Sequence, residues 1–303
     1  MKTNKINLLA LAALIITPAL YAAPALSDSG TPAPVQGKDD PYNLPLAGPV
    51  MQAGSTADSK NFDTTVMPSL QKFIQQALPE GQNNTQSKAF ELDPGKLVMA
   101  SSYNVTATFV YENAGYQNAI GVDTAAAGQK GPQSAFDEVT SPTAKLVFPD
   151  ASTPAGGGAA IGTGATTASQ PVVPGDFVNV GTYGKGTLLD FFLIANGANG
   201  GSQVFSANEA LNQDGFKQHV AGFTTHIFAV PQLNSPYIFL AFEDLAGGGD
   251  QDINDTIIAL NVGAATVNSL LATPEPAMPL TFAACLGVAL IAVRKNKKAN
   301  ATV

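Results

Sequence analysis

The pattern that most limits the fold of this 303-residue chain is a series of short apolar segments between residues 97 and 263. They are rich in β-branched and aromatic residues and alternate apolar with polar side chains, which is typical of strands with one buried face. Gly, Pro, Asn and Asp separate them, as expected for turns. The predicted strands are Tyr103–Tyr111, Lys145–Phe148, Asp176–Val180, Leu188–Ala195, His219–Val230, Tyr237–Glu243 and Thr256–Val262. Short strands joined by turns favour a mainly β fold, an antiparallel β-sandwich of the jelly-roll-like kind.

A single soluble helix is predicted, at Met67–Ala77. Pro68 suits the first turn of a helix, Leu70 and Ile74 share one face, and Pro79 ends the pattern. The other parts of the mature chain are assigned as a flexible leader (23–60), a helical lead-in (61–96), the β-sandwich domain (97–263) and its Gly-, Ala- and Thr-rich loop insertion (151–169).

The N-terminal 22 residues have the features of a secretory signal peptide. Lys2 and Lys5 form a charged start, and Leu8–Ile16 is an apolar run of the length that such signals use. Small residues follow, so cleavage is predicted after Ala22. An uncleaved membrane anchor is the alternative, but the apolar run is short for a span.

The C-terminal end has three parts in a fixed order. A linker at residues 264–276 ends in Pro274-Glu275-Pro276, residues 277–293 form an uncharged apolar helix, and residues 294–303 form a basic tail. That helix would be roughly 25 Å long, the lower limit for crossing a bilayer. The basic tail should stay cytoplasmic and leave the bulk of the protein outside.

This arrangement resembles the PEP-CTERM sorting signal recognised by exosortases of Gram-negative bacteria. The resemblance implies transient retention in the inner membrane, cleavage near Glu275 by an exosortase-type processing protease, and release to the cell surface or matrix. By analogy only, it also implies an association with exopolysaccharide and biofilm.

The segment between the two ends is acidic and contains no cysteine. Residues 26–273 hold 22 Asp and Glu against nine Lys and no Arg, an excess of thirteen negative charges. Such a surface repels nucleic acid and attracts divalent cations. The one cysteine, Cys285, lies in the C-terminal apolar segment, so no disulfide is available to the exported domain. Core burial or a metal ion must therefore stabilise it.

An acidic, glycine-rich loop between two predicted strands carries the strongest chemical signal. Three consecutive glycines precede Asp250, Asp252 and Asn254, whose alternation copies the 1-3-5 spacing of a Ca²⁺-wrapping loop. Asp244 and Asp255 complete the predicted ligand set. The loop is not an EF-hand, because its sixth position is Asp255 rather than Gly. The alternative is an acidic hairpin whose Asp side chains cap turn amides.

The same loop resembles the hallmark of a bacterial surface domain of unknown function that recurs in PEP-CTERM proteins. Further stretches of that resemblance are Tyr111–Gly121 and Gly184–Gly197, and together they span residues 97–263. The resemblance implies a β-sandwich with a calcium-type loop. Glu112 and Asn113 either reach the loop as extra ligands or mark a turn.

Catalytic arrangements are weak in this sequence. His219 and His226 are the only histidines and lack an evident third zinc ligand, and no Gly-x-Ser-x-Gly elbow is present. We therefore expect a non-enzymatic, Ca²⁺-stabilised surface or matrix protein with a structural or adhesive role. The alternative is a carbohydrate-binding module for exopolysaccharide, with sugar stacking on Tyr42, Tyr103, Tyr116 or Tyr183; a glycosidase is the third possibility.

Overall fold

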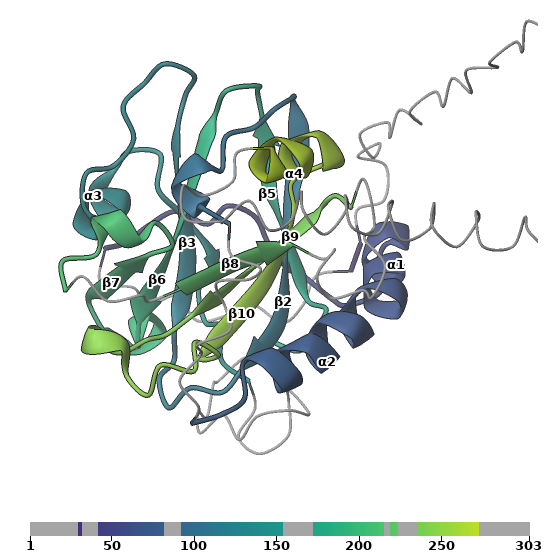
Figure 1. Ribbon diagram of the computed structural model, residues 1–303, viewed down its shortest axis with the longest axis horizontal. Helices are drawn as coiled ribbons and strands as arrows, with labels where there is room; N and C mark the ends of the chain where they lie inside the picture. The colour runs from purple at the N-terminus through teal and green to yellow at the C-terminus, as the bar shows by residue number, and fades with distance from the viewer. Residues whose placement is uncertain are drawn as a thin grey trace, which may run out of the picture.

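In the computed structural model, strands from distant parts of the chain form two antiparallel sheets with few helices around them (Figure 1). The structure describes residues 30–31, 42–81, 92–153, 172–214, 219–223 and 235–272. The six-stranded sheet A has the order β1 (Val50–Met51), β5 (Phe177–Tyr183), β2 (Tyr103–Glu112), β10 (Thr256–Asn261), β9 (Tyr237–Phe242), β8 (His219–Phe223). The four-stranded sheet B has the order β4 (Lys145–Phe148), β3 (Ala119–Ala125), β6 (Leu188–Ala195), β7 (Gln203–Ser206).

The main hydrophobic core draws side chains from both sheets. Phe109 of β2 and Ile258 of β10 come from sheet A, whereas Phe148 of β4 and Phe191 of β6 come from sheet B. The rings of Phe109 and Phe148 meet edge to face at 6.2 Å. Residues of sheets A and B are therefore buried in the same apolar cluster, and removing this surface from water favours the folded state.

Two helices cover the other face of sheet A. Helix α1 (Ala57–Thr65) begins with a capping box at Thr56 and Ser59, and α2 (Met67–Ala77) follows after Val66. Leu70 and Ile74 of α2 are buried with residues of β2, β9 and β10. The helix predicted at Met67–Ala77 is thus confirmed with the same bounds. Glu80, which follows this helix, lies at the end of sheet A that carries the β9–β10 loop.

The outer face of sheet B is covered by helix α3 (Ala135–Thr140) and by the segment around Leu44. Helix α4 (Ala264–Leu271) packs Val267 and Leu270 into the main core. Residues 264–271 were expected to be linker, but their apolar side chains are spaced to bury one helical face. Short 3₁₀ turns complete the fold at Pro94–Lys96 (η2), Gly197–Asn199 (η3), Glu209–Leu211 (η4) and Ala246–Gly248 (η6).

Several sequence expectations fall outside the described residues. These are the signal peptide, the sorting motif, the helix at 277–293, the basic tail, most of the loop insertion and the end of the strand predicted to reach Val230. In the part of the chain that the structure describes, no helix combines the length and apolarity needed to cross a bilayer. Residues 23–60 were expected to be a flexible leader, but within them Val50–Met51 pairs with β5 as β1.

Candidate functional site

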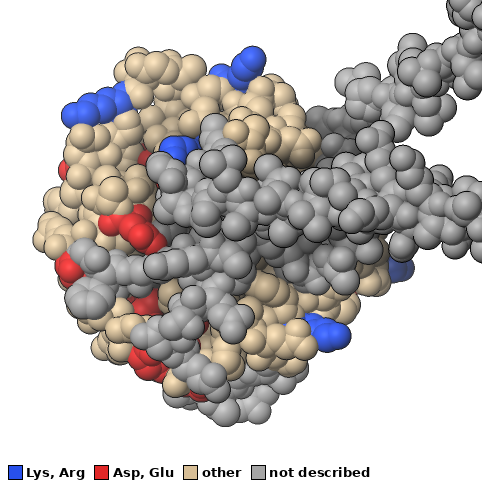
Figure 2. All heavy atoms as spheres, in the orientation of Figure 1, with Lys and Arg blue, Asp and Glu red and all other residues tan. Residues whose placement is uncertain are grey.

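The acidic loop, residues 243–255, joins β9 to β10, which are neighbours in sheet A. Phe242 at the end of β9 lies opposite Thr256 at the start of β10, and Thr256 also lies opposite Glu112 at the end of β2. The loop therefore projects from one end of the sheet. Asp and Glu side chains gather on the left and lower part of the face in Figure 2, where this loop lies in Figure 1.

Left-handed backbone conformations recur through the loop. The φ angles are +78° at Gly247, +84° at Gly248 and +47° at Gly249, and they remain positive at Gln251 and Ile253. Positive φ is unusual for a β-branched residue, so Ile253 is strained. Its side chain is buried in the cluster beneath α2, and that burial offsets the strain.

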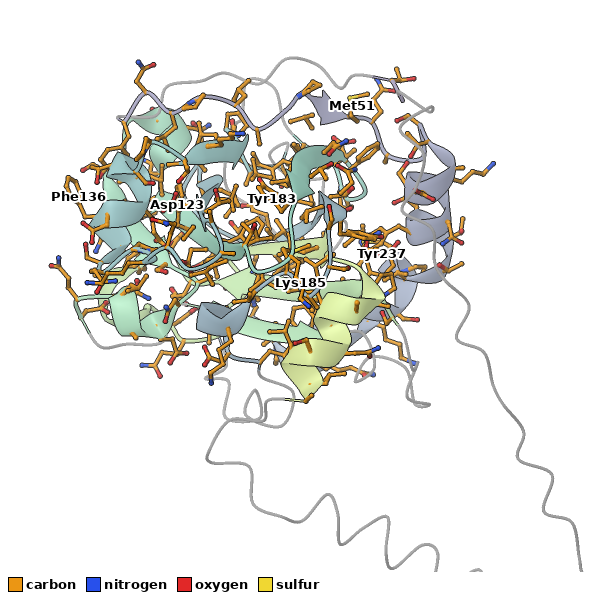
Figure 3. All side chains as sticks on the ribbon, turned by 90° about the horizontal axis from the view of Figure 1, so that it is seen from above. Met51, Asp123, Phe136, Tyr183, Lys185 and Tyr237 are labelled. Atoms are coloured by element: carbon orange, nitrogen blue, oxygen red, sulfur yellow. The ribbon has the colours of Figure 1, made fainter. Side chains whose placement is uncertain are left out.

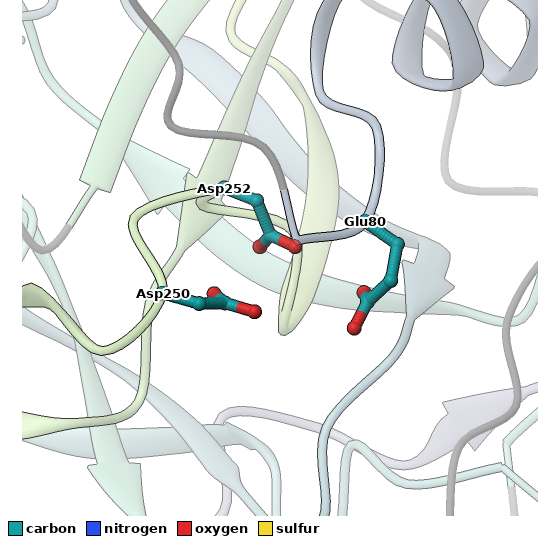
Figure 4. Close-up of side chains that lie close together, drawn as sticks. All are labelled: Glu80, Asp250 and Asp252. Carbon is teal, nitrogen blue, oxygen red and sulfur yellow. The ribbon is translucent and has the colours of Figure 1, made fainter.

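The predicted ligands divide into two groups instead of forming one. In the first group, Asp250 and Asp252 meet Glu80, and one carboxylate oxygen of each lies within 4.8 Å of the others. Figure 4 shows Glu80 approaching the two aspartates from the segment that follows α2. In the second group, Asp244 and Asp255 meet Glu243 at the same spacing.

Asp252 is the buried member of the first group. Its Oδ2 accepts the backbone N–H of Gly81 at 2.7 Å, and its Oδ1 accepts that of Asn254 at 3.3 Å. Burial is the largest cause that raises the pKa of Asp252 to about 7, with the negative charges of Asp250 and Glu80 adding to it. Glu80 in turn accepts a hydrogen bond from the Asn113 amide. Burial of Asp252 beside two exposed carboxylates thus favours a proton or a cation next to it.

The second group is more deeply buried. Asn118 donates from Nδ2 to Asp244 Oδ2 at 2.7 Å, while its own Oδ1 accepts the backbone N–H of Asn196 at 3.0 Å, which fixes its orientation. Asp255 Oδ2 accepts the backbone N–H of Asp244 at 2.8 Å. Burial, followed by the charges of its neighbours, raises the pKa of Asp255 and of Glu243.

Two buried oxygens at the site have no hydrogen-bond partner among the described residues. They are Oε2 of Glu243 and Oδ1 of Asn254, whose Nδ2 donates to the carbonyl oxygen of Leu78 at 3.0 Å. Capping of turn amides, the alternative interpretation of this loop, accounts for Asp255 and Asp252 but leaves these two oxygens unexplained. A buried acceptor without a donor is costly, and a bound cation would remove that cost.

The donor set fits a hard divalent cation. Every side-chain ligand in the two groups is a carboxylate oxygen, which suits Ca²⁺ or Mg²⁺ rather than a soft metal. Calcium binds oxygens at about 2.3–2.6 Å, so ligands on opposite sides of one ion lie about 5 Å apart. Within the described residues the one ion pair joins Lys96 to Asp93, so none of these carboxylates pairs with a described lysine.

Sequence reasoning missed Glu80 and Glu243 as members of the two acidic groups. Glu80 belongs to a different part of the chain and carries no local signal, whereas Glu243 stands in the same acidic run as Asp244. Of the optional ligands, Asn113 contacts Glu80, but Glu112 is bound elsewhere: it accepts hydrogen bonds from the Thr153 hydroxyl at 2.6 Å and from the Ala114 N–H at 2.9 Å. Glu112 thus braces a neighbouring turn and adds no ligand to the loop.

The zinc alternative stays untested, because the side chain of His219 is not among those that the structure describes. His219 begins β8, and His226 lies outside the described residues. The acidic groups identified in the described part of the chain contain no histidine.

Comparison with known proteins places a family domain over the loop. Residues 184–263 carry the "Domain of unknown function (DUF4114)", a stretch that runs from just before β6 through β10 and includes the whole acidic loop. No curated protein and no solved structure matches the chain significantly. The family description assigns no activity, so the function has to be argued from the site itself.

Proposed function

We propose that this chain is an exported cell-surface or extracellular-matrix protein with a structural or adhesive role, and that Ca²⁺ bound at the β9–β10 loop stabilises it. In this proposal the two sheets form a jelly-roll-like β-sandwich, and the loop ion closes one end of it. The observation that carries the proposal is the buried Glu243–Asp244–Asp255 group with the unpartnered Oε2 of Glu243.

An ion at this group would join two strands of sheet A. Glu243 and Asp244 directly follow β9, and Asp255 directly precedes β10, so a shared cation ties the ends of adjacent strands together. It would also cancel the repulsion among three carboxylates that are largely removed from water. Because binding occurs only in the folded state, it would stabilise the fold by about 2.7 kcal/mol at a hundredfold excess over the dissociation constant.

The chemistry of the site favours calcium over magnesium. Calcium accepts irregular shells of six to eight oxygens, whereas magnesium demands a tight octahedron and retains its waters. Weak affinity is adequate outside the cell, where calcium-binding modules work with dissociation constants of about 10⁻⁴–10⁻³ M. Export by the N-terminal signal and sorting by the Pro274-Glu275-Pro276 segment would deliver the protein to that environment.

The test is a melting experiment on the purified full-length chain in mild detergent, with added Ca²⁺, with Mg²⁺ and with a chelator. We expect calcium to raise the melting temperature by several degrees and magnesium to do so poorly. Asp255→Asn keeps the shape of the side chain and should abolish most of the calcium response. Asp93→Asn removes a carboxylate from the surface pair with Lys96 and should leave the response intact. No heat of binding and no thermal shift at millimolar Ca²⁺ would refute the calcium site.

A further inference from the structure

A second surface feature lies between α3 and the edge strand β7. There the chain forms a hollow of about 400 Å³, within the range of small-molecule sites. The side chains that matter for its chemistry are Tyr42, Phe136, Gln203, Asn212, Gln213 and Asp214. They come from four separate segments, so the hollow exists only in the folded protein.

One wall of the hollow is aromatic. Phe136 of α3 is 55% exposed, more than any other large apolar side chain among the described residues. The ring of Tyr42 stands edge-on to it, with centroids 6.1 Å apart and planes at 72°, and the Tyr42 hydroxyl donates to the carbonyl oxygen of Ser202. Figure 3 places Phe136 at the periphery of the molecule. An aromatic ring held in water at a hollow that is lined by both apolar and polar side chains is a feature of ligand sites rather than of cores.

The polar part of the lining is partly rigid. Asn212 is buried and bonds Ser206 in both directions: its Oδ1 accepts the Ser206 N–H at 2.8 Å, and its Nδ2 donates to the Ser206 carbonyl at 3.0 Å. This brace holds the segment that carries the exposed side chains Gln213 and Asp214 against β7. Asp214 Oδ2 also accepts the backbone N–H of Gly247 at 2.8 Å, so the hollow borders the acidic loop.

The lining selects for an uncharged, polyhydroxylated ligand. Gln203 and Gln213 can each donate and accept hydrogen bonds, Asp214 accepts them, and the aromatic pair offers an apolar surface. A hexose ring has one apolar C–H face and a rim of hydroxyls, which matches this combination. Among the described residues, no lysine or arginine lines the hollow, so phosphate, nucleic acid and acidic sugars would meet the Asp214 carboxylate without a compensating cation from this part of the chain.

We propose that the hollow between α3 and β7 binds a neutral oligosaccharide, with one hexose ring packed against Phe136 and Tyr42 and its hydroxyls hydrogen-bonded by Gln203, Gln213 and Asp214. The site contains none of the proposed calcium ligands and stands independently of the calcium proposal. Binding of this kind would give the surface protein a means of attachment to a polysaccharide, and the site requires no catalytic step.

Calorimetric titration of the full-length chain, with Ca²⁺ present throughout, tests the proposal. The probes are three neutral hexasaccharides (cellohexaose, laminarihexaose and mannohexaose) and an acidic oligogalacturonate. At least one neutral probe should bind at micromolar to millimolar concentration, and the acidic one should bind more weakly. Phe136→Ala should weaken binding about tenfold, a change typical of losing one aromatic contact.

Two further variants keep the test decisive. Phe136→Tyr retains the ring and should bind like the unmodified protein, while Leu271→Ala removes an exposed apolar side chain on the distant helix α4 and should have no effect. Because Phe136 is exposed, its truncation should leave the melting temperature nearly unchanged. The proposal is wrong if no neutral hexasaccharide binds at millimolar concentration, if Phe136→Ala binds as tightly as the unmodified chain, or if oligogalacturonate binds equally well.

Discussion

Replacing Gly249 by Ala tests whether the Glu243 carboxylate can occupy its place in the acidic loop only when residue 249 has no side chain. Gly249 has φ +47° and ψ −127°, a conformation that side chains rarely permit. A Cβ atom at this position would lie 1.8 Å from Glu243 Oε1 and 2.7 Å from its Cδ. No real contact is that short, so the Glu243 carboxylate must shift from its position in the Glu243–Asp244–Asp255 group.

The expected loss has two separable parts. Holding Ala in a strained backbone conformation costs about 1–3 kcal/mol, whether or not calcium is present. Displacing Glu243 also removes the calcium stabilisation, about 2.7 kcal/mol at a hundredfold excess of ion over its dissociation constant. For a domain of this size each kcal/mol lowers the melting temperature by roughly 2–4 °C. Gly249→Ala should therefore melt lower than the unmodified protein, and the gap should widen when calcium is added.

Gly247→Ala is the matched control in the same loop. Gly247 has φ +78°, but nothing lies within 4 Å of the position that its Cβ would occupy. Its substitution should cost about 1 kcal/mol of backbone strain and keep the calcium response. Differential scanning calorimetry of both variants, with calcium and with chelator, compares the two. A Gly249→Ala protein whose melting temperature rises with calcium as much as that of the unmodified protein would refute the role given to Glu243.

Three other predictions concern separate parts of the chain. Asp190 is buried, its Oδ1 has no hydrogen-bond partner among the described residues, and it lies opposite Asp123 in the β3–β6 ladder. Figure 3 labels Asp123. Burial, followed by the charge of Asp123, raises the pKa of Asp190 to about 7. The folded state then holds this proton more tightly than the unfolded state, so the free energy of unfolding should fall as the pH rises from about 4 to about 7. In urea unfolding, Asp190→Asn should flatten that fall and raise the free energy of unfolding by up to about 4 kcal/mol at pH 8. An unchanged pH profile would contradict the burial argument. In the same assay, Ile74→Ala should lower the free energy of unfolding by about 2–5 kcal/mol, because it opens a cavity between α2 and sheet A. Replacing its exposed neighbour, Gln75→Ala, should cost nearly nothing. Equal losses in the two variants would show that α2 is not packed as described. Glu275→Ala should leave the precursor in the membrane fraction, and equal release of both forms on fractionation would exclude the sorting role.

Local sequence patterns determined most of the strands and the main helix. The segments predicted at Lys145–Phe148, Leu188–Ala195 and Met67–Ala77 became β4, β6 and α2 with the same bounds. In each of them, β propensity or helical periodicity agrees with the face that is finally buried, so short-range information was sufficient.

The elements that sequence reasoning missed depend on partners far along the chain. Strand β3 (Ala119–Ala125) contains Gly121 and Asp123, which interrupt an apolar pattern, and its flat surface at Gly121 makes room for the Phe192 ring of β6. Helix α1 has few apolar residues, and its position rests on the Thr56 cap and on Phe62, whose ring packs 5.2 Å from Tyr237 of β9. Propensity cannot identify such elements, because the contacts that favour them are not local.

For the candidate site, the sequence by itself determined the chemistry, and the tertiary structure decided the grouping. The spacing of Asp250, Asp252 and Asn254 marked an oxygen-rich loop, since residue type and glycine freedom are local properties. The two separate groups followed only from the fold: packing of α2 on sheet A carries Glu80 to Asp250 and Asp252, and pairing of β9 with β10 sets Glu243 and Asp244 beside Asp255. Hydrophobic burial elsewhere in the fold brings together carboxylates that are distant in the sequence. Its favourable free energy outweighs their mutual repulsion.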